Sequence, residues 1–334
     1  MTPAELSRSV QGAVRCAVAA GELGVEVPER VLVERPRGPR QGDYATSVAL
    51  RLAGAAGRPA REVAGILAGR LVGEPGIARV DVAGPGFLNI TLESRAHAGL
   101  VDRIRDRRHE YGRTAHPRAF PVPPTTTCDA RPVVLAEVCE RLVRGARPVP
   151  VRPAGVAYRE LLDRLGPDAT HWALLRPPAQ DVPCLAAEAL LAQREANPLF
   201  RVRYAHARSR ALLRNGRDLG VDPDRTAQAM TESGAGDGDG GHPSATGSAL
   251  LAHLADHPRI VAAAARDRAP DRVARHLERT ADAFFRWYDT CPALPRGDEK
   301  PSAVHEARLR LADAAGIVLA DGLHLLGISA PDHL

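Results

Sequence analysis

Lysine and cysteine are both scarce in this sequence of 334 residues. Lys300 is the single lysine among 45 lysines and arginines, so a lysine-rich phosphate-binding loop is excluded. The cysteines are five, an odd number, and none lies three positions from another as a Cys-x-x-Cys zinc site requires. They do not indicate a disulfide framework either, and this usage favours a reducing cytoplasm. The five are Cys16, Cys128, Cys139, Cys184 and Cys291.

Long apolar runs are also missing. The N-terminus lacks the basic and then apolar pattern of a signal peptide, and no run is long enough to cross a bilayer. The sequence therefore predicts a soluble protein without a membrane partner. A net charge of +5 and a pI near 9.2 suit a polyanionic partner, because arginines pair with phosphates. The alternative is an arginine-rich composition that leaves only a solvated basic surface.

The first third of the chain predicts a small α+β domain. Thr2–Glu5 has the pattern of a capping box, and apolar residues then recur every fourth position as in an amphipathic helix. A second helix is expected from Asp43. Two strands, Val80–Ala83 and Phe87–Leu92, are expected around a Gly-Pro-Gly turn. We therefore expect this domain to comprise residues 1–112.

The remainder predicts a mainly α protein. Prolines are dense from Ala119 to Pro153, a stretch that carries one helical segment, Val134–Leu142. Helices are then expected at Arg159–Leu165 and Leu185–Gln193. Residues 185–334 read as a helical domain in which Asn197 caps a long helix, with a flexible Gly-rich insertion at 231–248. Three more helices are expected in it: Ala249–Asp267, Asp271–Tyr288 and Ser302–Leu326.

Two segments resemble the N-terminal additional domain of arginyl-tRNA synthetases: Gln41–Leu50, and Val82–Asn89 with its Gly-Pro-Gly turn. In that family this domain contacts the D-loop side of tRNA, and the aromatic residue and Asn after the turn read a D-loop base. The resemblance implies this role for Phe87 and Asn89. Strand alternation also predicts that both lie on the open face of the sheet. The alternative is an incompletely covered ring and an Asn that stabilises the turn.

The last 140 residues or so resemble the anticodon-binding helical bundle of the same family. The matching segments are Asn197–Arg208, Ala283–Pro292 and Ala320–Pro331. The sequence departs from the family at two points: Arg201 stands where a second tyrosine is usual, and Leu334 where a methionine is usual. Both departures bear on anticodon specificity.

Four side chains of this bundle are candidate RNA contacts. On a helix, Phe200, Tyr204 and Arg208 share one face, which offers two rings and a guanidinium to an unpaired loop. Trp287 is the fourth candidate. Core aromatics and a salt bridge are the alternative explanation. The same aromatics would also suit a protein interface.

The signatures of class I amino-acid activation are missing from the middle of the chain. No His-x-Gly-His segment and no lysine loop is present. Residues 149–155, followed by Asp168-Ala169-Thr170-His171, resemble the run from that loop to the family's Asp-Ala-Leu-Arg motif without its lysines. His253 and His257 lie four apart, but Leu254 replaces the Glu of a zinc hydrolase motif, so an exposed helix face is expected.

The sequence therefore predicts no catalytic residue, no metal and no cofactor. The main hypothesis is a non-catalytic paralogue of arginyl-tRNA synthetase, with residues 113–184 as a reduced remnant of the catalytic core. Its partner would be tRNA or a tRNA-like RNA. The alternative is a docking or regulatory module whose helical bundle binds the genuine synthetase or another protein.

Overall fold

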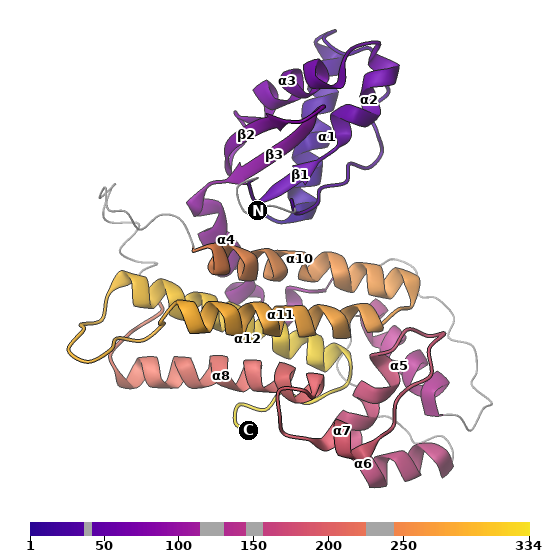
Figure 1. Cartoon of the computed structure of the whole chain (residues 1–334), viewed down its shortest axis with the longest axis vertical. Helices are drawn as coiled ribbons and strands as arrows, with labels where there is room; N and C mark the ends of the chain where they lie inside the picture. Colours follow the sequence, from indigo (N-terminus) through magenta and orange to yellow (C-terminus); the bar gives the residue numbers. More distant parts are fainter. Residues whose placement is uncertain (37–41, 114–129, 145–155, 225–243) are drawn as a thin grey trace. The chain divides into compact units, whose positions relative to one another are not determined.

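The computed structural model of the chain contains two compact units, Met1–Leu100 with Gly241–Ser248, and Val101–Gly240 with Ala249–Leu334 (Figure 1). In the part of the chain that the structure describes, no helix is long and apolar enough to cross a membrane. Residues 231–243 of the predicted glycine-rich insertion and the predicted lysine-loop remnant at 149–155 lie outside the described residues. The insertion is predicted to extend to residue 248, but a helix already begins at Ala245. The described residues are 1–36, 42–113, 130–144, 156–224 and 244–334.

Three helices build one side of the first unit: α1 (Pro3–Ala19), α2 (Val48–Ala56) and α3 (Ala60–Leu71). The predicted capping box is confirmed, because the Thr2 hydroxyl accepts from the Glu5 N–H and the Glu5 carboxylate accepts from the Thr2 N–H. The apolar positions of α1 that recur every fourth residue are buried in the core of this unit, which fixes the helix against α3.

A three-stranded antiparallel sheet completes the unit, in the order β1 (Tyr44–Thr46), β3 (Phe87–Leu92) and β2 (Ile77–Ala83). The two predicted strands are confirmed. The predicted start of a helix at Asp43 is wrong, since Tyr44–Thr46 is strand β1 and the helix begins only at Val48. The Asp43 N–H donates to the Ile90 carbonyl at 2.9 Å, and the Asp43 carboxylate accepts from the Leu92 N–H at 2.8 Å. Pairing with a distant strand therefore overrides the local helical pattern.

The second unit is helical. Helices α8 and α12 approach closely at two glycines: a Cβ on Gly316 would lie 2.3 Å from Ser209 Oγ, and one on Gly216 would lie 2.4 Å from a Leu309 methyl carbon. Helix α11 packs against both. The helices, with the boundary between the units inside α4, are α4 (Ser94–Arg107), η1 (Arg108–Glu110), α5 (Ala130–Arg144), α6 (Val156–Leu175), α7 (Ala187–Leu191), α8 (Pro198–Asp218), α10 (Ala245–Asp267), α11 (Asp271–Thr290) and α12 (Ala303–Leu325).

The predicted fold class is confirmed: the chain is mainly helical with one small three-stranded sheet. The helix predicted at Leu185–Gln193 is shorter, covering only Ala187–Leu191. Helix α6 bends where Gly166, with a φ of 73°, precedes Pro167, because a proline inside a helix removes a hydrogen bond. The domain limits inferred from the sequence stay predictions.

Candidate RNA interface

Three aromatic rings form a stacked ladder on the second unit. Phe200 and Tyr204 on α8 have ring centroids 5.7 Å apart at an interplanar angle of 7°. Tyr204 and Phe285 on α11 have centroids 5.6 Å apart at 23°. Tyr204, the middle ring, is 37% exposed, and the other two are half-buried. The ladder therefore presents ring surface to the solvent instead of filling the core.

The start of α8 fixes the two rings that it carries. The Asn197 side chain caps the helix by accepting from the Leu199 N–H at 3.1 Å. Its amide also donates to the carbonyls of Leu190 and Ala192, each at 2.8 Å. Because Asn197 bonds on both sides, the first turn of α8 cannot rotate freely. The four-residue spacing of Phe200 and Tyr204 then places one ring above the other.

Two arginines flank the ladder. The guanidinium of Arg201 lies 5.2 Å from the ring centroid of Phe285 and pairs with Asp282 at 2.7 Å. That of Arg208 lies 4.9 Å from the ring centroid of Tyr288, and its Nε donates to the Tyr288 hydroxyl at 3.0 Å. Among the described residues, no carboxylate pairs with Arg208. A ring surface bordered by an uncompensated cation suits stacked bases with an anionic backbone.

Trp287 is misplaced as a candidate RNA contact. Its side chain is 2% exposed and packs beside Phe284, with ring centroids 5.8 Å apart. It lies on the inner face of α11 with Leu277 and Phe284, so its ring is part of the core. Phe285, which sequence reasoning missed, is the accessible ring instead. The adjacent pair Phe284-Phe285 was the available signal, since only one of two neighbouring helical residues faces the core.

The sheet of the first unit carries the other two candidates. Phe87 is 41% exposed at the end of β3, as expected, while Leu88 and Ile90 are fully buried on the opposite face. Asn89 is only 8% exposed, so the expectation that its amide is open to solvent is wrong. The reason is that β3 is the central strand, and Asn89 lies between Ala45 and Asp81 of its neighbours. Among the described residues, its amide makes no hydrogen bond.

The turn before Phe87 is held against α3. Gly86 has a φ of 142°, and a Cβ there would lie 2.8 Å from the Ala60 carbonyl oxygen. The Arg61 Nη1 donates to the Gly84 carbonyl at 3.3 Å. The close backbone approach requires glycine at position 86 and gives the Phe87 ring a defined starting point.

The Asp-Ala-Thr-His segment, Asp168–His171, holds the C-terminal residues. The Asp168 carboxylate accepts from the Ser329 N–H at 2.9 Å and pairs with Arg203 at 3.5 Å. His171 bonds through Nδ1 to the Leu326 carbonyl at 3.2 Å and through Nε2 to the Tyr158 hydroxyl at 3.0 Å. Burial lowers the pKa of His171. In this structure the segment therefore fixes the chain after α12.

A second buried histidine holds the same tail. His206 on α8 bonds through Nδ1 to the Pro331 carbonyl at 3.0 Å. Its side chain is almost fully buried, and burial lowers the pKa of His206 as well. Both imidazoles are thus favoured in the neutral form, which can donate one hydrogen bond to a carbonyl without a buried charge.

The exposed helix face expected at His253 and His257 is wrong. His253 is half-buried, and His257 is fully buried, with its Nε2 3.0 Å from an Asp321 carboxylate oxygen. The His257 ring also stacks near His276, at a centroid distance of 5.4 Å. Within the described ranges, no group of three or more His, Cys, Asp or Glu side chains has a metal-binding arrangement. The histidines are part of the packing between α10, α11 and α12.

Comparison with known protein families gives two matches. Residues 5–92 match the arginyl tRNA synthetase N terminal domain, and residues 202–334 match the DALR anticodon binding domain. The first match contains Phe87 and Asn89, and the second contains Tyr204, Arg208 and Phe285.

Individual relatives agree with the family matches. An arginine–tRNA ligase of Frankia alni is 26% identical in an alignment of 562 residues that takes in all of both chains. One of Paenarthrobacter aurescens is 42% identical over 179 residues, which are 54% of this chain and 31% of that relative. The Thermus thermophilus arginyl-tRNA synthetase structure has a TM-score of 0.66, 14% identity and full coverage of both chains, a likeness of fold. The alignment with the Paenarthrobacter relative therefore spans about a third of that relative's length.

Proposed function

We propose that this chain, an arginyl-tRNA synthetase-related protein with that family's N-terminal domain and a DALR anticodon-binding domain, binds tRNA or a tRNA-like RNA without activating an amino acid. The anticodon-binding domain supplies the main contact. The N-terminal domain supplies a second one on the D-loop side. The chain works in the reducing cytoplasm.

The ring ladder carries this proposal. Tyr204 and Phe285 lie within the match to the anticodon-binding domain and stack with Phe200, which lies two residues before it. Arg208 lies beside these rings without an acidic partner among the described residues. Sequence-specific recognition of RNA mostly targets unpaired bases, which are splayed out and stacked on aromatic side chains. Each stacked base contributes about 1–3 kcal/mol. An anticodon loop offers unpaired bases of this kind.

The N-terminal site supports a smaller contribution. Phe87 offers one ring, and Asn89 offers an amide that is not used by other described residues. An amide that can both donate and accept can read the edge of a base. Its low exposure restricts the contact to a base that approaches the sheet closely beside Ala45 and Asp81.

The absence of amino-acid activation is supported by the middle of the chain. The match to the N-terminal domain ends at residue 92, and the match to the anticodon-binding domain begins at residue 202. The alignment with the Frankia relative extends over 562 residues, whereas this chain has 334. The sequence has one lysine and no His-x-Gly-His segment. Adenylation requires donors on the ATP phosphates, and these signatures would supply them.

Two measurements test the proposal. Gel shifts of the full chain with total tRNA, titrated with KCl, are expected to give binding at low salt that weakens as salt rises. No binding at low salt, or a salt slope near zero, would reject the RNA function. Arginine-dependent exchange of pyrophosphate into ATP is expected to stay at the background of a protein-free control. Exchange above background would reject the non-catalytic assignment while leaving RNA binding in place.

A further inference from the structure

A row of arginines runs along the solvent side of α11, beside the ring ladder. Arg272, Arg275, Arg279 and Arg286 are exposed at spacings of three, four and seven residues, which place them on one face of the helix. The opposite side of α11 is core. Between its first and last members this arginine stripe extends about 21 Å, at 1.5 Å per residue.

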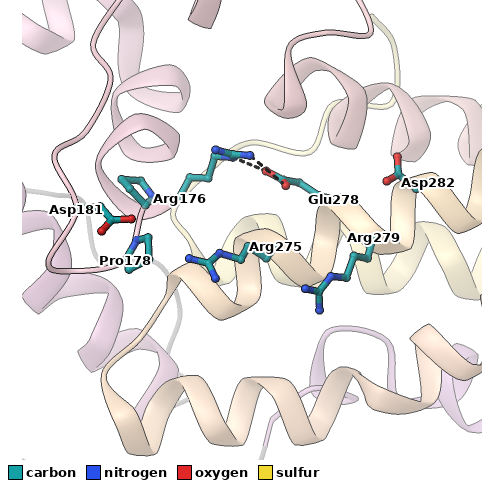
Figure 2. Close-up of a pocket in the computed structure, with 8 residues that line it drawn as sticks. Arg176, Pro178, Asp181, Arg275, Glu278, Arg279 and Asp282 are labelled. Atoms are coloured by element: carbon teal, nitrogen blue, oxygen red, sulfur yellow. Dashed lines mark hydrogen bonds and ion pairs between the residues drawn. The ribbon is translucent and has the colours of Figure 1, made fainter. Parts of the chain in front are cut away.

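Three acidic side chains on α11 have cationic partners, whereas Asp289, near the end of the helix, has no ion-pair partner among the described residues. Arg176 reaches Glu278 through Nε at 2.6 Å and Nη2 at 3.4 Å (Figure 2). Asp282 pairs with Arg201 at 2.7 Å, and Asp271 pairs with Arg275 at 3.3 Å.

A fourth carboxylate, Asp267, is shared by Arg266 at 2.9 Å and Arg272 at 3.0 Å. Arg279 and Arg286 contact no acidic side chain among the residues that the structure describes. The stripe therefore keeps surplus positive charge after its ion pairs are counted.

A fixed loop forms a wall opposite the first half of the stripe. The Arg131 guanidinium donates to the carbonyls of Pro177 at 3.0 Å and Pro178 at 2.7 Å, and its Nε donates to that of Leu174 at 3.1 Å. Between this loop and α11 lies a groove of about 550 Å³. Arg275 and Arg279 line it. Both also line an adjacent pocket of about 330 Å³, shown in Figure 2, where they extend from α11 and no interaction is drawn between them and the other residues shown.

The charge of the groove is not uniform. Asp181, on the loop, lines the neighbouring part of the surface and has no cationic partner among the described side chains. A phosphate would be repelled near Asp181 and attracted near Arg279. The favourable path for a polyanion thus follows α11 and not the loop.

The stripe is continuous with the ladder through Phe285 and Asp282. Phe285 is the neighbour of Arg286 and the third ring of the ladder. Arg201 neutralises Asp282 and stacks over Phe285. A strand whose bases reach the rings would therefore have its backbone beside Arg286 and Arg279.

We propose that the arginine stripe of α11 is a track for the phosphates of the RNA strand whose unpaired bases stack on the ring ladder. The inference rests on the proposed RNA function and adds the direction of the strand's path, from the ladder toward the N-terminal end of α11. Phosphate contacts fix register and orientation, while the rings contact the bases.

The test compares two double variants of the full chain. Arg279→Gln with Arg286→Gln removes two stripe cations without breaking an ion pair between described residues. Arg159→Gln with Arg217→Gln is the matched control, since both are exposed on other helices and contact no acidic side chain among the described residues. Dissociation constants for labelled total tRNA are measured at several KCl concentrations, after thermal unfolding has verified that both variants fold.

Loss of two phosphate contacts is expected to make the slope of log K against log salt shallower by about 1.4–1.8, and to weaken binding on the order of tenfold or more at 0.1 M salt. The control is expected to keep the wild-type slope. An unchanged slope in the stripe variant, while Tyr204→Ala still weakens binding, would overturn the stripe and leave the proposed function intact. An equal loss in the control would also overturn it. Absence of tRNA binding by the wild-type chain would instead reject the proposed function, and the stripe with it.

Discussion

The two aromatic surfaces of this protein differ in how their rings are supported. Phe87 stands at the end of a strand and has no aromatic neighbour among the described residues, whereas Tyr204 lies between two stacked rings from two helices. A ring that is already stacked loses little freedom when a base joins the stack, so more of the stacking energy remains as affinity. If the chain binds RNA as proposed, we therefore expect the helical domain to supply most of the base-stacking energy.

The polar groups beside the two aromatic surfaces also differ, one being a charged guanidinium and the other a neutral amide. Beside the ladder, Arg208 contributes charge, which attracts any phosphate. On the sheet, Asn89 contributes an amide held between two strands, which suits the edge of one base. We therefore expect the helical domain to supply affinity and the sheet to supply selectivity.

The largest expected effect separates the core ring of α11 from its surface ring. Trp287→Ala should lower the free energy of unfolding by about 3–5 kcal/mol, because a buried ring is replaced by a cavity. Phe285→Ala should lower it much less and should weaken RNA binding. Denaturant unfolding followed by far-ultraviolet circular dichroism, with tRNA binding measured on the same samples, checks both. A stable Trp287→Ala protein that has lost RNA binding would return Trp287 to the interface.

The second prediction compares the two units in acid. Burial lowers the pKa of His171 and His206 from 6.5, so between the folded and unfolded values the unfolded chain binds more protons. Their contribution is complete above pH 6.5 and is lost as the pH falls below it. The steepest loss is about 1.4 kcal/mol per pH unit for each histidine. The first 100 residues contain one histidine, His97, so the helical domain should be the more acid-sensitive part.

Tryptophan fluorescence makes this measurement specific. Trp172 and Trp287 are the two tryptophans of the chain, and both are buried in the second unit. The midpoint temperature of thermal unfolding, followed by this fluorescence, should decrease when the pH is lowered from 7.5 to 5.5. His206→Asn places an amide donor, Nδ2, where Nδ1 donates to the Pro331 carbonyl and removes one titrating group, so its midpoint should depend less on pH. An equal pH dependence in this variant would exclude His206 as a source of the effect.

Local patterns in the sequence were sufficient where the interacting groups are near in the chain. The capping box at Thr2, the cap at Asn197 and the stacking of Phe200 on Tyr204 all join residues within four positions. Strand β1 could not be predicted, because its residues pair with Ile90 and its neighbours more than forty positions away. The low exposure of Asn89 could not be predicted either, because Asn89 is covered by β1.

The candidate site was predictable to the same extent. The α8 rings follow from their spacing, but the third ring of the ladder comes from α11, and no pattern within one helix indicates which faces of two helices meet. Choosing Phe285 over Trp287 as the surface ring required the packing of α11 against α8 and α12. The partners of Arg201 and Arg208 also lie on α11 and depend on the same packing.

The last prediction measures the two aromatic surfaces directly. Tyr204→Ala removes the middle ring of the ladder and should weaken tRNA binding by about 1–3 kcal/mol, whereas Phe87→Ala removes an isolated ring and should cost at the lower end of that range. Tyr204→Phe keeps the ring and should bind like the wild type, which separates stacking from the hydroxyl. Dissociation constants at one fixed salt concentration suffice, because neither change removes a charge. A larger loss for Phe87→Ala than for Tyr204→Ala would reverse the assignment and make the sheet, with Asn89, the main RNA-binding surface.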